Sequence, residues 1–146
     1  MMSGENLDYL TQQFKLIEEY IRRARAIASL SLSEYLDDPN LGDASVRQLT
    51  VLFETCHNVG KHILSRRGWR EPLNKAETFE ILAEQGVLAL SLVDALREAA
   101  RFRNLVTYQT TMVNETKVYE ILQDHLGDFD RFLAEVAGWL STHPEP

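Results

Sequence analysis

The chain has 146 residues, of which 45% are hydrophobic and 25% charged; this suits one globular domain and excludes a disordered protein. Its net charge of −7 excludes a protein that coats nucleic acid by bulk electrostatics, so DNA is not an expected partner. The single cysteine, an opening unlike a signal peptide and the lack of an apolar run of roughly 18 residues predict a cytoplasmic protein that does not enter a membrane.

Apolar side chains recur in steps of three and four along the first part of the chain, and this spacing predicts a helix over about 6–30. The apolar positions are Leu7, Leu10, Phe14, Ile17, Ile21, Ala24 and Ala28. Residues 31–42 are predicted to be a connector with one helical turn at about 33–36, and Asp38-Pro39-Asn40 brings that turn to an end.

A second apolar stripe predicts a helix over about 43–67 that ends at Gly68. The stripe consists of Val46, Leu49, Phe53, Cys56, Val59 and Ile63. Asn74 and Glu77 have the spacing of a capping box, so a shorter third helix is predicted to begin at Asn74 and to close at Gly86.

Two further helices complete the predicted fold. Ser91 has the same spacing to Asp94 and predicts the start of a fourth helix, and a fifth is predicted over about 114–140. The stripe of the fifth helix is Val118, Leu122, Phe129, Leu133, Val136 and Leu140. No segment alternates apolar and polar residues over a sustained stretch, so no sheet is expected. The sequence predicts an all-α antiparallel bundle of four to five helices in a single domain, 1–146, with its core at about 7–140.

Arg103 interrupts the apolar face of the fourth predicted helix, because it shares that face with Leu96 and Val106. A guanidinium cannot shed its proton, so its burial is costly unless it is paired. Arg103 therefore either holds a structural carboxylate, with Glu54 as the candidate, or awaits an anion from outside the chain. Asn104, a poor helix former directly beside it, favours a site.

The histidines and the cysteine do not form a recognisable metal site. His57 and His62 are five residues apart, whereas two ligands on one helix face need a step of four. Cys56 lies on the apolar stripe, as a small core residue does. We therefore expect no bound metal and no cofactor.

Residues 65–70 join three arginines to Trp69 at the predicted end of the second helix. Cations suit the carboxyl end of a helix, so this stretch fits a solvated last turn. It also fits a contact with phosphate or RNA in which Trp69 stacks on a base. The sequence leaves both interpretations open.

Several stretches, taken in order, resemble the HepT-like family of HEPN-type helical domains. Members carry Phe-Arg-Asn, then Leu-Val-His with a nearby Tyr, then a helix with Val-Tyr-x-x-Leu. This chain has Phe102-Arg103-Asn104-Leu105-Val106-Thr107-Tyr108, followed by Val118-Tyr119-Glu120-Ile121-Leu122. Residues 54–62 resemble the family's second helix, and residues 79–87 resemble its third helix and the turn that follows. The likeness covers about residues 7–140.

The resemblance implies a homodimer with a composite cleft between the protomers. It also implies a partner encoded beside it, a minimal nucleotidyltransferase antitoxin of the MntA type. The activity it implies is metal-independent cleavage of RNA by an arginine and a histidine separated by four residues. Arginine binds and neutralises phosphate, and histidine transfers protons near neutral pH.

The chain departs from the family pattern at the histidine. Alignment on the Val-Tyr motif without gaps places Tyr108 at the histidine position, and one gap places Thr107 there instead. A phenol with a pKa of about 10 is a poor base at pH 7. Loss of a general base typically lowers the rate by a factor of about 10²–10⁴.

The remaining site residues follow from the same resemblance. Arg103 and Asn104 match the family's phosphate-binding pair, and Tyr108 completes the catalytic set. The tyrosine that the partner enzyme nucleotidylates corresponds to Thr110. Glu54 and Asn58 are supporting residues, and at Asn58 relatives are expected to have an acid.

The sequence therefore predicts the toxin component of a HepT/MntA-type module whose ribonuclease activity is weakened or lost. One alternative is a non-catalytic protein that binds a nucleotide or positions substrate for a nucleotidyltransferase. A second alternative is a structural helical dimer without a ligand.

Overall fold

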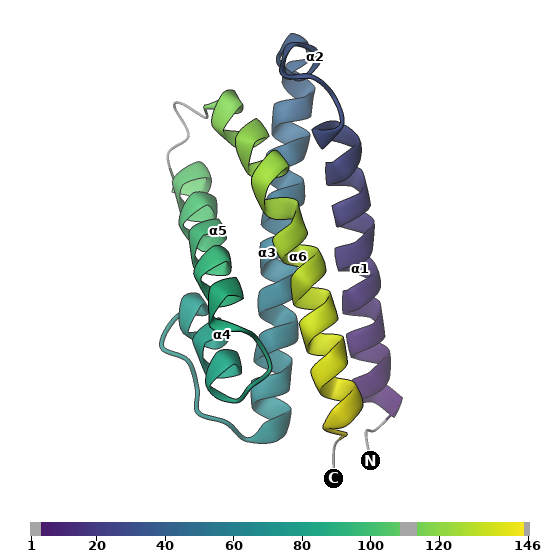
Figure 1. Cartoon of the computed structure of the whole chain (residues 1–146), viewed down its shortest axis with the longest axis vertical. Helices are drawn as coiled ribbons and strands as arrows, with labels where there is room; N and C mark the ends of the chain where they lie inside the picture. The colour runs from purple at the N-terminus through teal and green to yellow at the C-terminus, as the bar shows by residue number, and fades with distance from the viewer. Residues whose placement is uncertain (1–3, 109–113, 145–146) are drawn as a thin grey trace.

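The computed structural model describes residues 4–108 and 114–144, with the backbone alone at Glu5 and at 102–108, and these residues form six helices. The helices are α1 (Gly4–Ala28), α2 (Leu32–Asp37), α3 (Pro39–Arg67), α4 (Lys75–Glu84), α5 (Leu90–Tyr108) and α6 (Glu115–Thr142). Each long helix runs opposite to the long helix before it in the chain, so the predicted all-α antiparallel bundle is confirmed (Figure 1). Among the described helices, none is long and apolar enough to span a bilayer.

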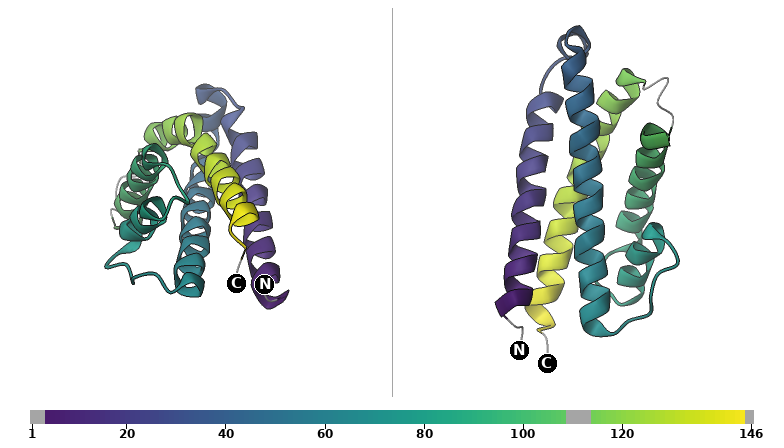
Figure 2. Two further views of the ribbon diagram at one scale, coloured as in Figure 1. Left: turned by 60° about the horizontal axis from the view of Figure 1, so that its bottom comes forward. Right: turned by 180° about the vertical axis from the view of Figure 1, so that it is seen from behind.

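The helices are arranged on the two sides of α3. α1 and α6 pack along one side of it, and α4 and α5 cover the other side, where α5 also reaches α6 (Figures 1 and 2). Phe79 of α4 lies at the centre of this arrangement. Its ring meets Phe53 of α3 edge-on at 5.8 Å and Phe132 of α6 at 6.1 Å, as aromatic pairs prefer. These three rings join both sides of the bundle into one core.

The connector differs from its prediction. Residues 32–37 form a helix of their own, α2, because Ser31 and Glu34 make a capping box in which each side chain accepts the other's backbone N–H. Asp38-Pro39-Asn40 was predicted only to end the preceding turn, but it also begins α3, four residues before the predicted start. Asp38 caps this helix by accepting the Asn40 N–H at 3.0 Å, and Pro39 occupies the first turn, where its missing N–H costs nothing.

The third predicted helix begins as expected, but only half of its capping box forms. Asn74 accepts the N–H of Glu77 at 2.9 Å. The Glu77 carboxylate does not return to Asn74; it accepts the Leu73 N–H at 3.0 Å and pairs with Arg70. Gly86 closes the turn after α4 with a φ of +81°, a conformation that glycine adopts without strain.

The start of α5 was predicted wrongly. The helix begins at Leu90, before Ser91, and the Ser91 hydroxyl accepts a hydrogen bond from Arg131 of α6 at 2.7 Å instead of capping. The Ala89 N–H ahead of the helix donates to Glu135 of α6 at 2.7 Å. A side chain of the neighbouring helix α6 therefore accepts a hydrogen bond from the backbone N–H just before α5. A local sequence pattern does not reveal such a contact.

Most predicted core positions are buried, with one clear exception. Leu7 is 54% exposed, because Asn6 turns inward in the first turn of α1 and is hydrogen-bonded to His62. Buried residues that the stripes missed include Ile27, Leu52, Leu64, Ile121, Leu126 and Phe132. Cys56 is fully buried, which confirms its place in the core, and burial raises the pKa of its thiol far above the ordinary value.

The close contact between α3 and α4 makes Gly60 sensitive to substitution. A Cβ at Gly60 would lie 3.0 Å from Thr78 Cγ2 and 3.1 Å from Leu82 Cδ1, whereas a Cβ at Gly127 on α6 meets nothing within 4 Å. Overpacking costs about 1–3 kcal/mol, and alanine gains about 1 kcal/mol over glycine inside a helix. We expect Gly127→Ala to raise the free energy of unfolding and Gly60→Ala to lower it. Urea denaturation measures both, and equal gains for the two variants would contradict the tight α3–α4 contact.

Candidate functional site

The residues predicted to form the site lie in the last turns of α5. The backbone is helical through Tyr108, so Arg103, Asn104 and Tyr108 share two consecutive turns, while their side chains and all of Thr110 lie outside the described residues. Leu96 is fully buried and Ala99 half-buried on this helix. The helix face on which the sequence places Arg103 is therefore the face that α5 turns toward the core in the turns before it.

The two supporting residues lie one turn apart on α3, and the structure adds a neighbour to them. Glu54 is half-buried, and both of its carboxylate oxygens accept from the Lys75 ammonium at 2.8 Å. Asn58 is exposed. The proposed pair between Glu54 and Arg103 stays a prediction. Lys75 was missed by sequence reasoning, because its contact with Glu54 depends on how α4 docks against α3.

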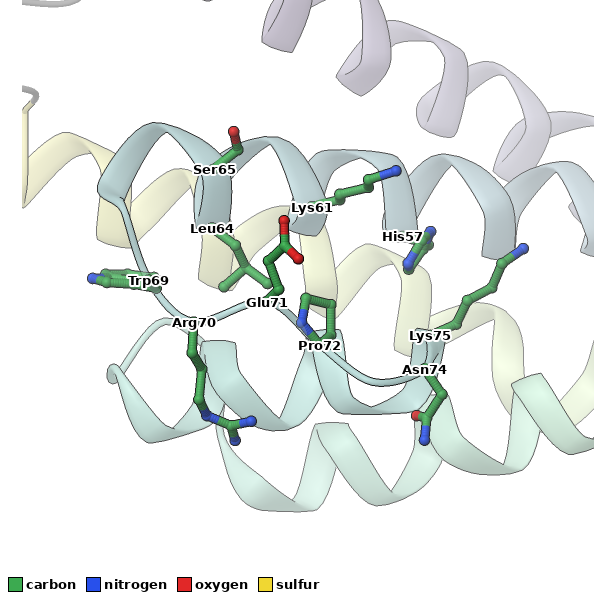
Figure 3. Close-up of a pocket in the computed structure, with 10 residues that line it drawn as sticks. All are labelled: His57, Lys61, Leu64, Ser65, Trp69, Arg70, Glu71, Pro72, Asn74 and Lys75. Atoms are coloured by element: carbon green, nitrogen blue, oxygen red, sulfur yellow. The ribbon is translucent and has the colours of Figure 1, made fainter.

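A cavity of about 610 Å³ lies beside these residues, between α3 and residues 69–75 (Figure 3). His57, Lys61 and Ser65, spaced four apart, line the wall formed by α3. Glu71 reaches into the cavity from the opposite wall, and Trp69 and Lys75 stand at its two ends (Figure 3).

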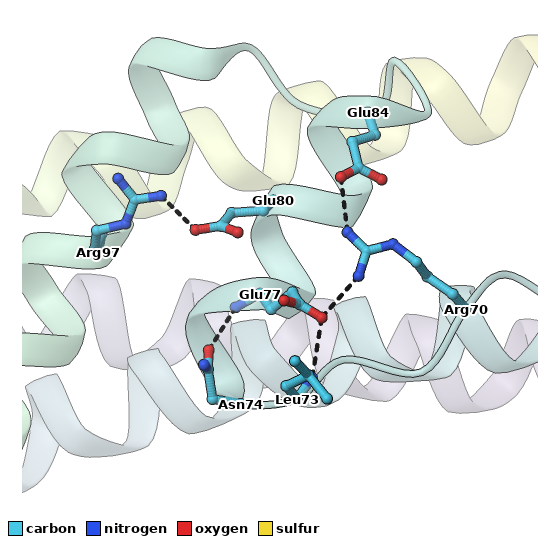
Figure 4. Close-up of polar contacts among 7 residues, drawn as sticks. All are labelled: Arg70, Leu73, Asn74, Glu77, Glu80, Glu84 and Arg97. Atoms are coloured by element: carbon cyan, nitrogen blue, oxygen red, sulfur yellow. Dashed lines mark hydrogen bonds and ion pairs between the residues drawn. The ribbon is translucent and has the colours of Figure 1, made fainter.

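Arg70 also borders the cavity, but its guanidinium turns away toward α4. It donates to Glu77 and to Glu84, each at 2.7 Å (Figure 4). The hydrogen bond with Glu84, and then that with Glu77, raises the pKa of this guanidinium. Arg97 of α5 donates to Glu80 of α4 at 2.5 Å in the same way (Figure 4). Arg70 therefore fixes the segment that forms the cavity wall.

Arg67 and Trp69 of the basic stretch pack against the end of α6. The rings of Trp69 and Trp139 meet edge-on at 5.7 Å, and the Arg67 guanidinium lies 4.7 Å from the centre of the Trp139 ring. Arg67 also donates to the backbone carbonyl of His143. Of these residues, Arg67 lies in the last turn of α3, Arg70 lies beyond the helix and is paired with carboxylates of α4, and Trp69 borders the cavity.

The histidines serve packing and hydrogen bonding. The ring of His57 meets Phe79 edge-on at 6.4 Å, and the rings of His62 and Tyr9 lie 4.5 Å apart, tilted by 33° to one another. His125 is hydrogen-bonded to Asp128 at 2.8 Å. Within the described part of the chain, no three residues among His, Cys, Asp and Glu are grouped as a metal would need.

Comparison with known proteins agrees with the resemblance read from the sequence. The mRNA nuclease HepT of Shewanella oneidensis is 24% identical over 126 residues, which cover 86% of this chain and 94% of that protein. A tri-AMPylated HEPN toxin of Shewanella oneidensis, solved in complex with the MNT antitoxin, superposes with a TM-score of 0.81 at 22% identity and covers 94% of this chain and 99% of its own.

A second solved structure shares the fold at greater sequence distance. The cytosolic protein YutE of Bacillus subtilis, whose function is unknown, superposes with a TM-score of 0.78 at 16% identity and with 93% of each chain covered. These structural likenesses show a common fold. The family description "Ribonuclease HepT-like" matches residues 17–136, which is most of the chain. The chain therefore belongs to the HepT-like ribonuclease family.

Proposed function

We propose that this chain is the toxin component of a toxin–antitoxin module and binds RNA, with ribonuclease activity that is weakened or lost. One observation carries the proposal: a chain that matches the HepT-like family over residues 17–136 has Arg103 and Asn104 on α5 but no histidine on that helix. The four histidines of the sequence are His57, His62, His125 and His143.

The residues on α5 keep the groups that bind phosphate but lack the histidine that transfers protons. Arg103 would bind and neutralise a phosphate of the RNA backbone, and Asn104 would add a hydrogen bond. Tyr108 occupies the position of the proton-transfer residue. Its phenol, with an ordinary pKa of about 10, is protonated at pH 7, so it would donate a proton but not remove one from a ribose hydroxyl. Binding without efficient cleavage follows.

We also propose a nucleotidyltransferase of the MntA type as the protein partner. The relative from Shewanella oneidensis is AMPylated and bound to its MNT antitoxin, and another related toxin–antitoxin structure contains AMP-PNP. On this chain the acceptor would be Thr110. Its hydroxyl oxygen would bond to the α-phosphorus of ATP as the bond to pyrophosphate breaks, and the hydroxyl proton would be released. Glu54 and Asn58 would support the same site from α3.

The absence of a histidine from α5 also supports a second function, that of a non-catalytic binding protein. Because α5 carries the arginine without the histidine, the protein would also fit a non-catalytic role, in which it holds a nucleotide or positions substrate for its partner. The two functions differ in whether RNA is cleaved, so a cleavage assay separates them.

Dimerisation is expected, with α5 near a two-fold axis and the site shared between protomers. Large apolar side chains are exposed on the described surface of α1 and α5, among them Leu7, Leu16 at 38% and Leu90 at 75%. Light scattering at micromolar concentration should give twice the chain mass of 16.7 kDa. A monomeric mass under those conditions would rule out a composite cleft.

Tyr108→His should restore the spacing of arginine and histidine and raise metal-independent cleavage of a mixed-sequence RNA by a factor of about 10²–10⁴. The pH profile of the variant should turn near 6.5, the ordinary pKa of histidine. Addition of Arg103→Ala to this variant should abolish the gain. The opposite result, robust cleavage by the wild type that is lost in Tyr108→Phe, would show that the phenol itself catalyses the reaction.

Arg103→Ala separates a structural arginine from one that binds substrate. A buried pair broken on one side costs about 3–5 kcal/mol. Glu54 already has Lys75 as a partner, so it would not be left alone in the variant. We therefore expect the free energy of unfolding, measured by thermal denaturation, to change by less than about 1 kcal/mol, as when a partly exposed ion pair is lost. RNA binding should weaken. A loss of stability near the larger figure would contradict a role in binding.

A further inference from the structure

We propose that the cavity between α3 and residues 69–75 is a subsite for single-stranded RNA, with a phosphate beside Lys61 and a base against Trp69. The inference rests on the proposed function for the identity of the ligand. It adds a binding surface that lies outside α5.

The size and shape of the cavity suit one nucleotide. Its volume of about 610 Å³ lies within the range of about 300–1,000 Å³ that is usual for sites of small molecules. One wall carries three polar side chains of α3 that are spaced four residues apart, namely His57, Lys61 and Ser65. Four residues of helix rise about 6 Å, so these side chains follow one another at short intervals, as contacts along an extended strand require.

The charges around the cavity single out Lys61 as the cation for a ligand. Three cations border the cavity, and two of them already have carboxylate partners: Lys75 is paired with Glu54, and Arg70 with Glu77 and Glu84. Lys61 is exposed and, among the described residues, has no ion-pair partner. Lysine binds phosphate as a point charge, so Lys61 is the group in this wall that would contact the backbone of an RNA.

Glu71 limits the affinity for an anion. Its carboxylate reaches into the cavity from the opposite wall (Figure 3). A phosphate at Lys61 would therefore meet one repulsive charge within the same cavity. Removal of this charge should strengthen binding, while removal of Lys61 should weaken it, so the site makes two predictions of opposite sign.

Trp69 supplies an aromatic surface at one end of the cavity. The indole is half-buried and is held by edge-on contact with Trp139, whose own ring lies under Arg67. A ring fixed in this way is a preformed platform for stacking, which tolerates any base. Stacking requires an unpaired base, so the ligand class is single-stranded rather than duplex RNA.

Fluorescence anisotropy with a labelled 12-nucleotide 2′-O-methyl RNA tests the subsite on the full chain, because this probe lacks the hydroxyl needed for cleavage. Lys61→Gln should weaken binding about 3- to 10-fold and lower the slope of log K against log salt by about 0.7. Glu71→Gln should tighten binding. Lys15→Gln is the matched control: it removes an exposed lysine from α1, on the other side of α3, and should change affinity less than twofold (Figure 1).

The outcomes separate the subsite from the proposed function. Affinities within twofold of wild type for both Lys61→Gln and Glu71→Gln, with weaker binding by Arg103→Ala, would overturn the subsite and leave the function standing. No RNA binding by the wild type would overturn both. Lys61 and Glu71 are exposed, so thermal unfolding of their variants should match the wild type and confirm that they fold.

The place of the base has its own readout. The chain has two tryptophans, so Trp139→Phe leaves Trp69 as the single indole and keeps an aromatic ring against it. Saturation of this variant with the same RNA should quench the Trp69 emission, because a stacked base lies against the ring. Unchanged emission at saturation would overturn the assignment of Trp69.

Discussion

The close approach of α4 to α3 at Gly60 determines where the functional surfaces of this protein lie. Thr78 and Leu82 reach the Gly60 backbone so closely that a Cβ there would touch both. Phe79, beside Thr78, enters the core between Phe53 and Phe132. This contact sets the height of α4 along α3. It thereby places Lys75 opposite Glu54, and it fixes the span that residues 69–74 must cross.

Ion pairs orient the elements that this contact brings together. Arg70 joins the crossing segment to α4, and Arg97 joins α5 to α4. These arginine side chains are about half exposed, and ion pairs at the surface add little to the stability of a fold. These ion pairs therefore orient the crossing segment and α5 relative to α4 more than they stabilise the fold. Arg70 in particular turns its charge from the cavity toward α4, so the basic stretch at the end of α3 offers fewer free cations than its sequence suggests.

The helices could be predicted from the sequence because periodicity and caps are local signals, and Asn74, Gly68 and Asn114 act where a local pattern places them. Two errors occurred where a distant residue decides the outcome, whereas α2 and the early start of α3 were missed although their caps, at Ser31 and Asp38, are local. Glu135 serves the start of α5, and His62 draws Asn6 inward in place of Leu7. Arg103 could be singled out because it interrupts an apolar stripe. The Glu54–Lys75 pair and the cavity could not be predicted from the sequence, because both arise only when α4 docks against α3.

Cys56 is the one cysteine of the sequence, and it lies fully buried at the middle of α3 with a thiol that burial keeps protonated. A reagent that requires a thiolate reaches it only when α3 separates from its neighbours. The rate at which Cys56 reacts therefore measures how often the core of the native protein opens. Because Cys56 is buried, such reagents do not react with the folded protein. A second cysteine introduced near the end of α5 would therefore be the residue that takes up a spectroscopic label, and Cys56 would not have to be replaced.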